Sequence, residues 1–165
     1  MSAFVVDTNV PVVANGRAEQ AGPRCVLACL AALEEVHDSG VVVLDDGMRV
    51  LQEYMDNLSM SGQPGAGDFF MKWVWENQAV PAHCERITIT PRGEAPDDFE
   101  EFPRDPELAG FDRADRKFVA LALASARRPT VLNAVDSDWW VFGDALARHG
   151  VVVNNLCPEQ RGASA

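Results

Sequence analysis

Long apolar runs are missing from this chain of 165 residues. Its uninterrupted apolar runs, such as VVVL at 41–44, are far too short to span a bilayer. The first residues also lack a basic stretch followed by an apolar segment, which is the pattern of a secretory signal. We therefore expect a cytoplasmic protein with no membrane partner.

Cysteines are few and scattered: Cys25, Cys29, Cys84 and Cys157. They could form two bridges, but their spacing matches neither a small secreted disulfide scaffold nor a CxxC motif, and we expect no zinc site. Cys25 and Cys29 lie four residues apart in a helical pattern. We expect both to face the core as small apolar side chains.

Basic residues are also scarce, with 14 Lys and Arg against 25 Asp and Glu and a net charge of -11. Because phosphate binding is driven by Lys and Arg, this balance argues at first against a nucleic-acid partner. However, much of the excess negative charge lies in residues 94–107, which carry seven acids, three prolines and one arginine. This segment predicts a solvated acidic loop, and a basic groove elsewhere stays open.

The chain alternates between strand-like and helix-like segments. Short apolar stretches predict strands at 3–6, 41–44, 87–90, 130–135 and 151–153. Amphipathic patterns and capping signals predict helices at 21–37, 44–58, 68–79, 112–126 and 138–149. In the second of these helices, Asp45 or Asp46 is placed to cap the first turn.

This alternation predicts an α/β fold. The strands are too apolar to have a wet face, so we expect a parallel sheet covered by helices on both sides. The length fits one domain, which we expect to span residues 1–157, with residues 158–165 as a disordered tail. In such sheets, ligands bind beyond the carboxyl ends of the strands.

Acidic side chains follow two of the predicted strands. Asp7 ends the first strand, and Asp136 and Asp138 end the fourth. Parallel strands bring these ends to one edge of the sheet. Asp112 and Asp115 are three residues apart, and so share one face, at the start of the helix that leads into the fourth strand.

Each acid also has a purely structural interpretation. Asp7 or Asn9 could cap a helix that begins at Pro11, and the acids at 112–115 and 136–138 could cap the helices that they precede. Glu53 lies at the boundary of the buried face of its helix, where it could also be a surface residue.

Taken together, the acids favour a metal site. Carboxylates about 5 Å apart repel by on the order of 3 kcal/mol at an effective dielectric near 20, so a converging cluster needs a cation. No Lys or Arg is adjacent in sequence to Asp7 or Asp136. Oxygen ligands suit Mg²⁺ or Mn²⁺, and the reaction to expect is attack of metal-activated water on a phosphodiester.

Four short motifs carry these acids: DTNV after the first strand, EY in the second helix, DRKFVALALA, and VDSDW after the fourth strand. In this order and at roughly this spacing, over residues 3–156, they resemble the acidic motifs of the PIN-domain nucleases. The resemblance implies a Rossmann-like three-layer α/β/α domain with a parallel sheet of four or five strands. It also implies a Mg²⁺- or Mn²⁺-dependent endoribonuclease that hydrolyses phosphodiester bonds of RNA.

The resemblance also assigns roles to individual residues. It implies four catalytic acids: Asp7, Glu53, Asp115 and Asp136. It implies these metal ligands: Asp7, Asp115, Asp136 and Asp138. Polar residues expected to orient them are Thr8, Asn9 and Asp112. The chain departs from the family pattern at Ala134, where the family usually has a threonine.

Partners follow from the same resemblance. Many family members are bacterial toxins, often dimeric and inhibited by a small antitoxin, so we expect RNA, an antitoxin and a second copy as partners. Basic residues that could line an RNA path flank the third motif: Arg113, Arg116, Lys117, Arg127 and Arg128. The stripe Phe69, Phe70, Trp73 and Val74 predicts core packing, with an antitoxin groove or a base-stacking surface as alternatives.

Two other functions stay open. A non-catalytic PIN-like module that binds RNA or protein would account for the acidic loop. A phosphohydrolase of the haloacid-dehalogenase kind also begins with an aspartate after the first strand, but it needs a second acid at position 9, where this chain has Asn9.

Overall fold

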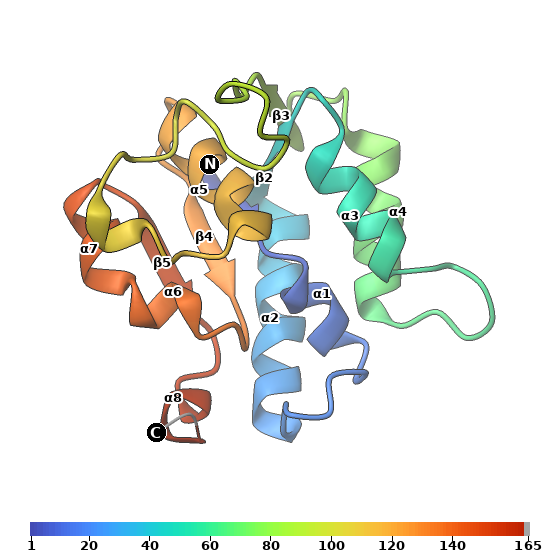
Figure 1. The fold of residues 1–165 in the computed structure, drawn as a ribbon. Helices are drawn as coiled ribbons and strands as arrows, with labels where there is room; N and C mark the ends of the chain where they lie inside the picture. Colours follow the sequence, from blue (N-terminus) through green and yellow to red (C-terminus); the bar gives the residue numbers. More distant parts are fainter. Residues whose placement is uncertain (164–165) are drawn as a thin grey trace.

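A five-stranded sheet forms the centre of the computed structural model, which describes residues 1–163 (Figure 1). All of its strand pairs are parallel, and the strand order is β3-β2-β1-β4-β5. The strands are β1 (Ser2–Val6), β2 (Gly40–Asp45), β3 (Cys84–Ile87), β4 (Thr130–Asn133) and β5 (Val152–Asn155). Every residue of β2 is buried, as expected for a central strand that is covered on both faces.

Helices connect the strands. They are α1 (Asn9–Ala14), α2 (Pro23–Ser39), α3 (Arg49–Asn57), α4 (Ala66–Asn77), α5 (Arg116–Ala124), α6 (Asp138–Val141), α7 (Gly143–Arg148) and α8 (Glu159–Ala163). Two short 3-10 helices, η1 (Pro106–Leu108) and η2 (Arg113–Asp115), precede α5. Asp45 accepts hydrogen bonds from the backbone N–H groups of Arg49 and Val50, so it binds the first turn of α3 as predicted, although the N-cap position is Met48.

The connections place helices on both faces of the sheet. From β1 the chain moves outward to β2 and then β3, with α2 packed on β2 and with α1 and α4 packed on α2. It then returns past β1 to β4, and α5 packs on β1, β2 and β4. Because parallel crossovers are right-handed, this reversal of direction puts α5 on the face opposite α2. The predicted three-layer α/β/α architecture is confirmed.

The strand order reverses between β1 and β4, and this is the point where ligands bind in open parallel sheets. The carboxyl ends of the strands lie at the lower edge of the sheet in Figure 1, where the arrowhead of β4 points. The pairing continues just past β1, because the backbone N–H of Asp7 donates to the carbonyl of Leu132 at 3.1 Å. Asp7 and the residues that follow β4 therefore lie side by side.

Most predicted elements differ from the structure by a few residues at their ends, and two differ more. The third strand covers Cys84–Ile87 rather than 87–90, because Asp45, the last residue of β2, pairs with Ile87 and leaves no partner beyond it. The predicted helix over 138–149 is divided into α6 and α7 at Phe142, whose φ of -94° and ψ of 12° leave the helical region. The ring of Phe142 packs edge-on against Phe111, with their centroids 5.7 Å apart.

The end of the chain also differs from the prediction. Residues 159–163, expected to be disordered, form α8, whereas residues 164–165 lie outside the described part. Cys25 in α2 faces the core, as predicted, but it forms a disulfide bond with Cys157 that the sequence analysis did not predict. Cys29 is free and buried, as predicted. Within residues 1–163, every helix is too short or too polar to cross a bilayer.

Candidate metal site at the carboxyl edge of the sheet

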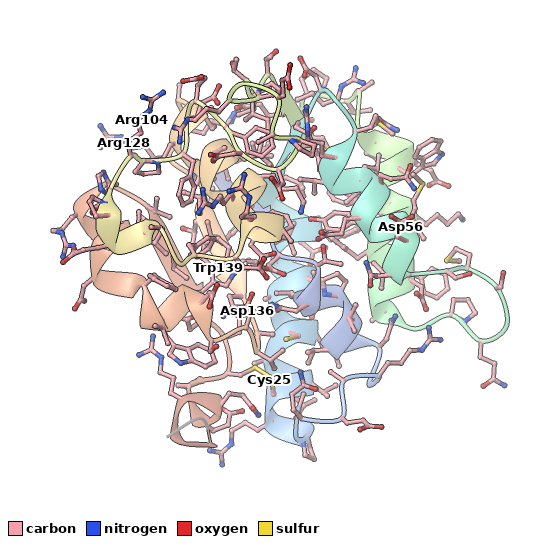
Figure 2. All side chains as sticks on the ribbon, in the orientation of Figure 1. Cys25, Asp56, Arg104, Arg128, Asp136 and Trp139 are labelled. Atoms are coloured by element: carbon pink, nitrogen blue, oxygen red, sulfur yellow. A yellow bond between two sulfur atoms is a disulfide. The ribbon has the colours of Figure 1, made fainter. Side chains whose placement is uncertain are left out.

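Three carboxylates converge beyond the carboxyl ends of β1 and β4. Asp7 directly follows β1, Asp136 lies in the loop after β4, and Asp115 ends η2. One ligand oxygen from each residue lies within 4.8 Å of the others. Figure 2 labels Asp136 at this edge, beside Trp139. The acids thus come from three segments that are distant in sequence.

Asp7 is the most deeply buried of the three, with 4% of its surface exposed. Its Oδ1 accepts the backbone N–H of Asn9 at 3.0 Å, and its Oδ2 accepts the indole N–H of Trp139 at 2.8 Å. Burial raises the pKa of Asp7 to about 7, the charges of Asp136 and Glu53 add to this effect, and the two hydrogen bonds oppose it.

The pKa of Asp115 is raised further than that of Asp7. Burial raises its pKa to about 9, and the neighbouring charges of Asp7 and Asp136 contribute to the rise. Without a cation, the cluster therefore keeps at least one proton at neutral pH. A divalent ion would displace that proton and neutralise the carboxylates, so the donor set fits a hard cation that prefers oxygen.

Asp136 and Asp138 shape the loop after β4. Oδ1 of Asp136 accepts the backbone N–H of Asp138 at 3.0 Å, and Oδ2 of Asp138 accepts the backbone N–H of Asp112 at 2.8 Å. Burial raises the pKa of Asp138, and the charges of Asp136 and Asp112 add to it. Asp138, predicted as a metal ligand, lies outside the group of three. Its carboxylate joins the β4 loop to the start of η2, which carries Asp115.

Glu53, from α3, lies beside the cluster and makes two polar contacts of its own. The Thr8 hydroxyl donates to one of its carboxylate oxygens, and Lys117 Nζ donates to the other at 2.8 Å. Glu53 also lies close enough to contribute to the raised pKa of Asp7. The structure therefore brings all four predicted catalytic acids to one region, with Lys117 neutralising the acid that lies outside the group of three.

Asn9 has a different role from the predicted helix cap. Its side-chain N–H donates to Asn133 Oδ1 at 2.8 Å, and its Oδ1 accepts the backbone N–H of Ala134 at 2.8 Å. The N-cap position of α1 is Thr8, whose side chain makes no capping bond. Asn9 thus fixes the end of β1 against the end of β4, at the place where the family pattern has a threonine.

Several residues of the site were not predicted from the sequence. The side-chain N–H of Asn133 donates to the backbone carbonyl of Asp136 and to Asn155, both at 2.9 Å. The Tyr54 hydroxyl donates to the carbonyl of Val6 at 2.5 Å, directly before Asp7. The polar Asn133 at the end of an apolar strand was the available signal. The bond from Trp139 to Asp7 needed the folded structure.

The basic residues near the third motif do not all reach solvent. Arg116 is only 7% exposed, and its guanidinium binds Asp98 at 3.2 Å and the carbonyl of Ala109 at 3.1 Å. The predicted RNA contact by Arg116 is therefore wrong, because this side chain anchors the acidic loop. Arg113 is exposed and pairs with Asp97 of the same loop at 3.1 Å.

A cavity of about 350 Å³ lies beside Glu53, between α3, the start of α5 and the acidic loop. Its cationic lining residues are Arg49, Arg113 and Lys117, and Asp97 and Phe99 of the acidic loop contribute to its wall. Arg127 and Arg128 come just before β4, at the amino edge of the sheet. Figure 2 shows Arg128 far from Asp136, so these two arginines do not line the site.

Comparisons with known proteins add no relative. No protein-family model matches the chain, and no curated protein or solved structure matches it significantly. The resemblance to PIN-domain nucleases thus stays a prediction based on the four acidic motifs. The function of the site is inferred from its residues and their geometry.

Proposed function

We propose that this protein is a Mg²⁺- or Mn²⁺-dependent endoribonuclease of the PIN type, with its catalytic centre at Asp7, Asp115 and Asp136. The observation that supports this most is the convergence of the three carboxylates at the switch point between β1 and β4. Burial there raises the pKa of Asp7 and of Asp115, and carboxylates with strongly raised pKa values are typical of functional sites.

Each residue of the proposed centre has a distinct role. Asp7, Asp115 and Asp136 would hold the ion, which when bound supplies an activated water and neutralises charge on the scissile phosphate. Trp139 and the Asn9 backbone fix the Asp7 carboxylate by hydrogen bonds. Glu53 would orient the attacking water and accept its proton, and Thr8 and Lys117 hold it in place.

The cavity beside Glu53 supports an anionic substrate. Arg49, Arg113 and Lys117 line it, and each can bind a phosphate of a single strand. Each of the three is paired with a carboxylate in the free protein: Asp45, Asp97 and Glu53 respectively. Because phosphates must replace some of these pairs and the net charge is -11, RNA binding would be weak and strongly salt-dependent.

A protein partner is also part of the proposal. A cavity of about 500 Å³ between α2 and α4 is lined by Leu30, Phe69, Phe70 and Trp73 among others. The predicted aromatic stripe is split here, because Phe70 is buried in the core whereas Phe69 is 53% exposed. This groove supports an amphipathic helix of a small antitoxin as partner. The homodimer and the cytoplasmic location remain predictions.

One observation favours a second function, a non-catalytic module that binds RNA or protein. The acidic loop occupies two basic residues of the third motif, with Asp97 on Arg113 and Asp98 on Arg116. Because the acidic loop pairs with these basic side chains, it lowers the affinity for RNA. A protein that binds another protein would tolerate that loss.

The deciding experiment compares RNA cleavage by the wild type, Asp115→Asn and Asp144→Asn with Mn²⁺ and with EDTA. Asp115 is largely protonated at neutral pH, so the near-isosteric Asn should leave the fold intact. We expect Mn²⁺-dependent cleavage that falls at least about 100-fold in Asp115→Asn, because loss of a ligand should cost no less than loss of a residue that orients one. Asp144, an exposed acid in α7, is the matched control and should have no effect.

Two results would contradict the proposal. Full cleavage by folded Asp115→Asn would remove this residue from the catalytic centre. Absence of cleavage by the wild type, together with no Mn²⁺-induced rise in melting temperature, would favour the non-catalytic module, because an ion that binds the folded state must stabilise it.

A further inference from the structure

Three sulfur atoms converge on the buried side of α2. Cys25 and Cys29 lie in the first two turns of this helix, and Cys157 follows β5. The three side chains are fully buried, and their sulfur atoms lie within 4.8 Å of one another. Figure 2 labels Cys25 below Asp136, beyond the same edge of the sheet. The fourth cysteine, Cys84, lies in β3 and is not part of this group.

Contacts other than the disulfide also hold the two segments together. Cys25 and Cys29 are four residues apart, so both point from the same face of α2. On the other side, the backbone N–H of Leu156 donates to the carbonyl of Asn133 at 2.8 Å, which extends the β4–β5 pairing to the residue before Cys157. The side chain of Gln160 in α8 donates to the carbonyl of Gln20 at 3.1 Å, close to the start of α2.

The disulfide uses only two of the three sulfur atoms. Cys25 and Cys157 are bonded, with their Cα atoms 5.1 Å apart, and Cys29 is a free thiol. A dithiol reductant would break this bond, and two electrons and two protons would convert the two sulfur atoms into thiols. The reduced protein would then present three thiols in one buried cluster. In the cytoplasm, cysteines are normally kept in the reduced thiol form.

We propose that the reduced protein binds one Zn²⁺ through the thiolates of Cys25, Cys29 and Cys157. Thiolates are soft ligands that favour Zn²⁺ and bind it at about 2.3 Å, and two ligands in adjacent turns of a helix are a common half of a zinc site. Each thiol releases its proton when the ion binds. Zinc and the disulfide are then alternative links between α2 and the segment after β5.

Glu159 is the candidate fourth ligand. It begins α8, two residues after Cys157, and its exposed side chain lies outside the group of three sulfur atoms.

Cobalt is the probe for this site, because cobalt bound to thiolates has a charge-transfer absorption in the near ultraviolet, whereas cobalt bound to carboxylates has none. We expect the fully reduced wild type to develop this band with one equivalent of Co²⁺ and to lose it when Zn²⁺ is added. The oxidised protein should not develop the band. Cys84→Ser should behave as the wild type, since Cys84 lies outside the cluster.

The variants that test the ligands are Cys29→Ser and Cys29→Ala. Both can still form the Cys25–Cys157 disulfide, so each can be folded and checked by circular dichroism in the oxidised state before reduction. We expect a smaller band and at least about tenfold weaker Co²⁺ binding in both. A reduced wild type that has four titratable thiols but no band would overturn the proposal, as would a band of full intensity in either variant. Neither outcome depends on RNA cleavage.

Discussion

Two clusters of potential metal ligands lie beyond the carboxyl ends of the strands, and they differ in chemistry and in exposure. The acidic cluster follows β1 and β4 at the switch point of the sheet, and Asp115 and Asp136 are partly exposed. The sulfur cluster follows β5, at the edge of the sheet, and is fully buried. Carboxylates repel one another and need a cation, whereas two sulfur atoms can satisfy each other by a covalent bond. The same edge of the sheet can therefore carry a reactive acidic cluster next to its central strands and a structural disulfide next to its outer strand.

Cys157→Ala should separate the two clusters most clearly. It removes a disulfide between residues 132 positions apart, and we expect the free energy of unfolding to fall by about 2–4 kcal/mol. Metal-dependent RNA cleavage should be unchanged, because the acidic cluster uses neither cysteine. Urea denaturation of the oxidised proteins measures the first effect. With reductant and without zinc, the difference in unfolding free energy between Cys157→Ala and the wild type should become small. If Cys157→Ala also lost RNA cleavage, the two clusters would be coupled.

Of the two clusters, Trp139→Phe should affect only the acidic one. It removes the indole N–H that donates to Asp7 Oδ2, and loss of a hydrogen bond to a ligand weakens metal binding by about tenfold. A thermal-shift titration with Mn²⁺ measures the change. Trp75→Phe, at an exposed position of α4, is the control. If Mn²⁺ affinity were the same in Trp139→Phe, Asp7 would not be a ligand whose orientation depends on Trp139.

The pH dependence of stability should reveal the acidic cluster without any substitution. The folded-state pKa values of Asp7 and Asp115 are about 7 and about 9, above the ordinary value of 3.8. The folded state therefore holds these protons more tightly than the unfolded state does, and metal-free stability should fall as pH rises from about 4 to about 9. Urea midpoints in EDTA measure this fall, which Mn²⁺ should reverse at the alkaline end.

Asp115→Asn is the control for this pH effect. Removing the carboxyl with the higher pKa should flatten the stability profile above about pH 7, where Asp115 alone still holds its extra proton. A profile identical to that of the wild type would mean that Asp115 titrates normally in the folded protein.

Asp97→Asn should have the smallest effect. It weakens an exposed ion pair with Arg113, and such pairs contribute only about 0–1 kcal/mol. RNA affinity should therefore rise only a few-fold, which can be measured by titrating RNA into the cleavage-deficient Asp115→Asn background. Glu94→Gln changes the same charge elsewhere on the acidic loop and should have less effect. Equal effects would indicate a general loss of negative charge rather than release of Arg113.

The sequence alone predicted the α/β class and the edge of the sheet at which the acids meet. Both follow from local pattern: apolar strands that alternate with helices require a covered parallel sheet, and parallel strands place Asp7 and Asp136 at the same edge. The capping role of Asp45 was also local, because its partners are the next residues of its own helix. In each case the relevant neighbours are close in sequence or follow from strand direction.

Only the tertiary structure determined the contacts between distant segments. Strand register ended β3 at Ile87, and the return of the chain after β5 brought Cys157 to Cys25. The packing of the acidic loop buried Arg116 on Asp98, so a basic residue of the third motif became an anchor rather than an RNA contact. Side-chain partners across such distances depend on the relative placement of whole elements. Periodicity along one segment carries no information about that placement.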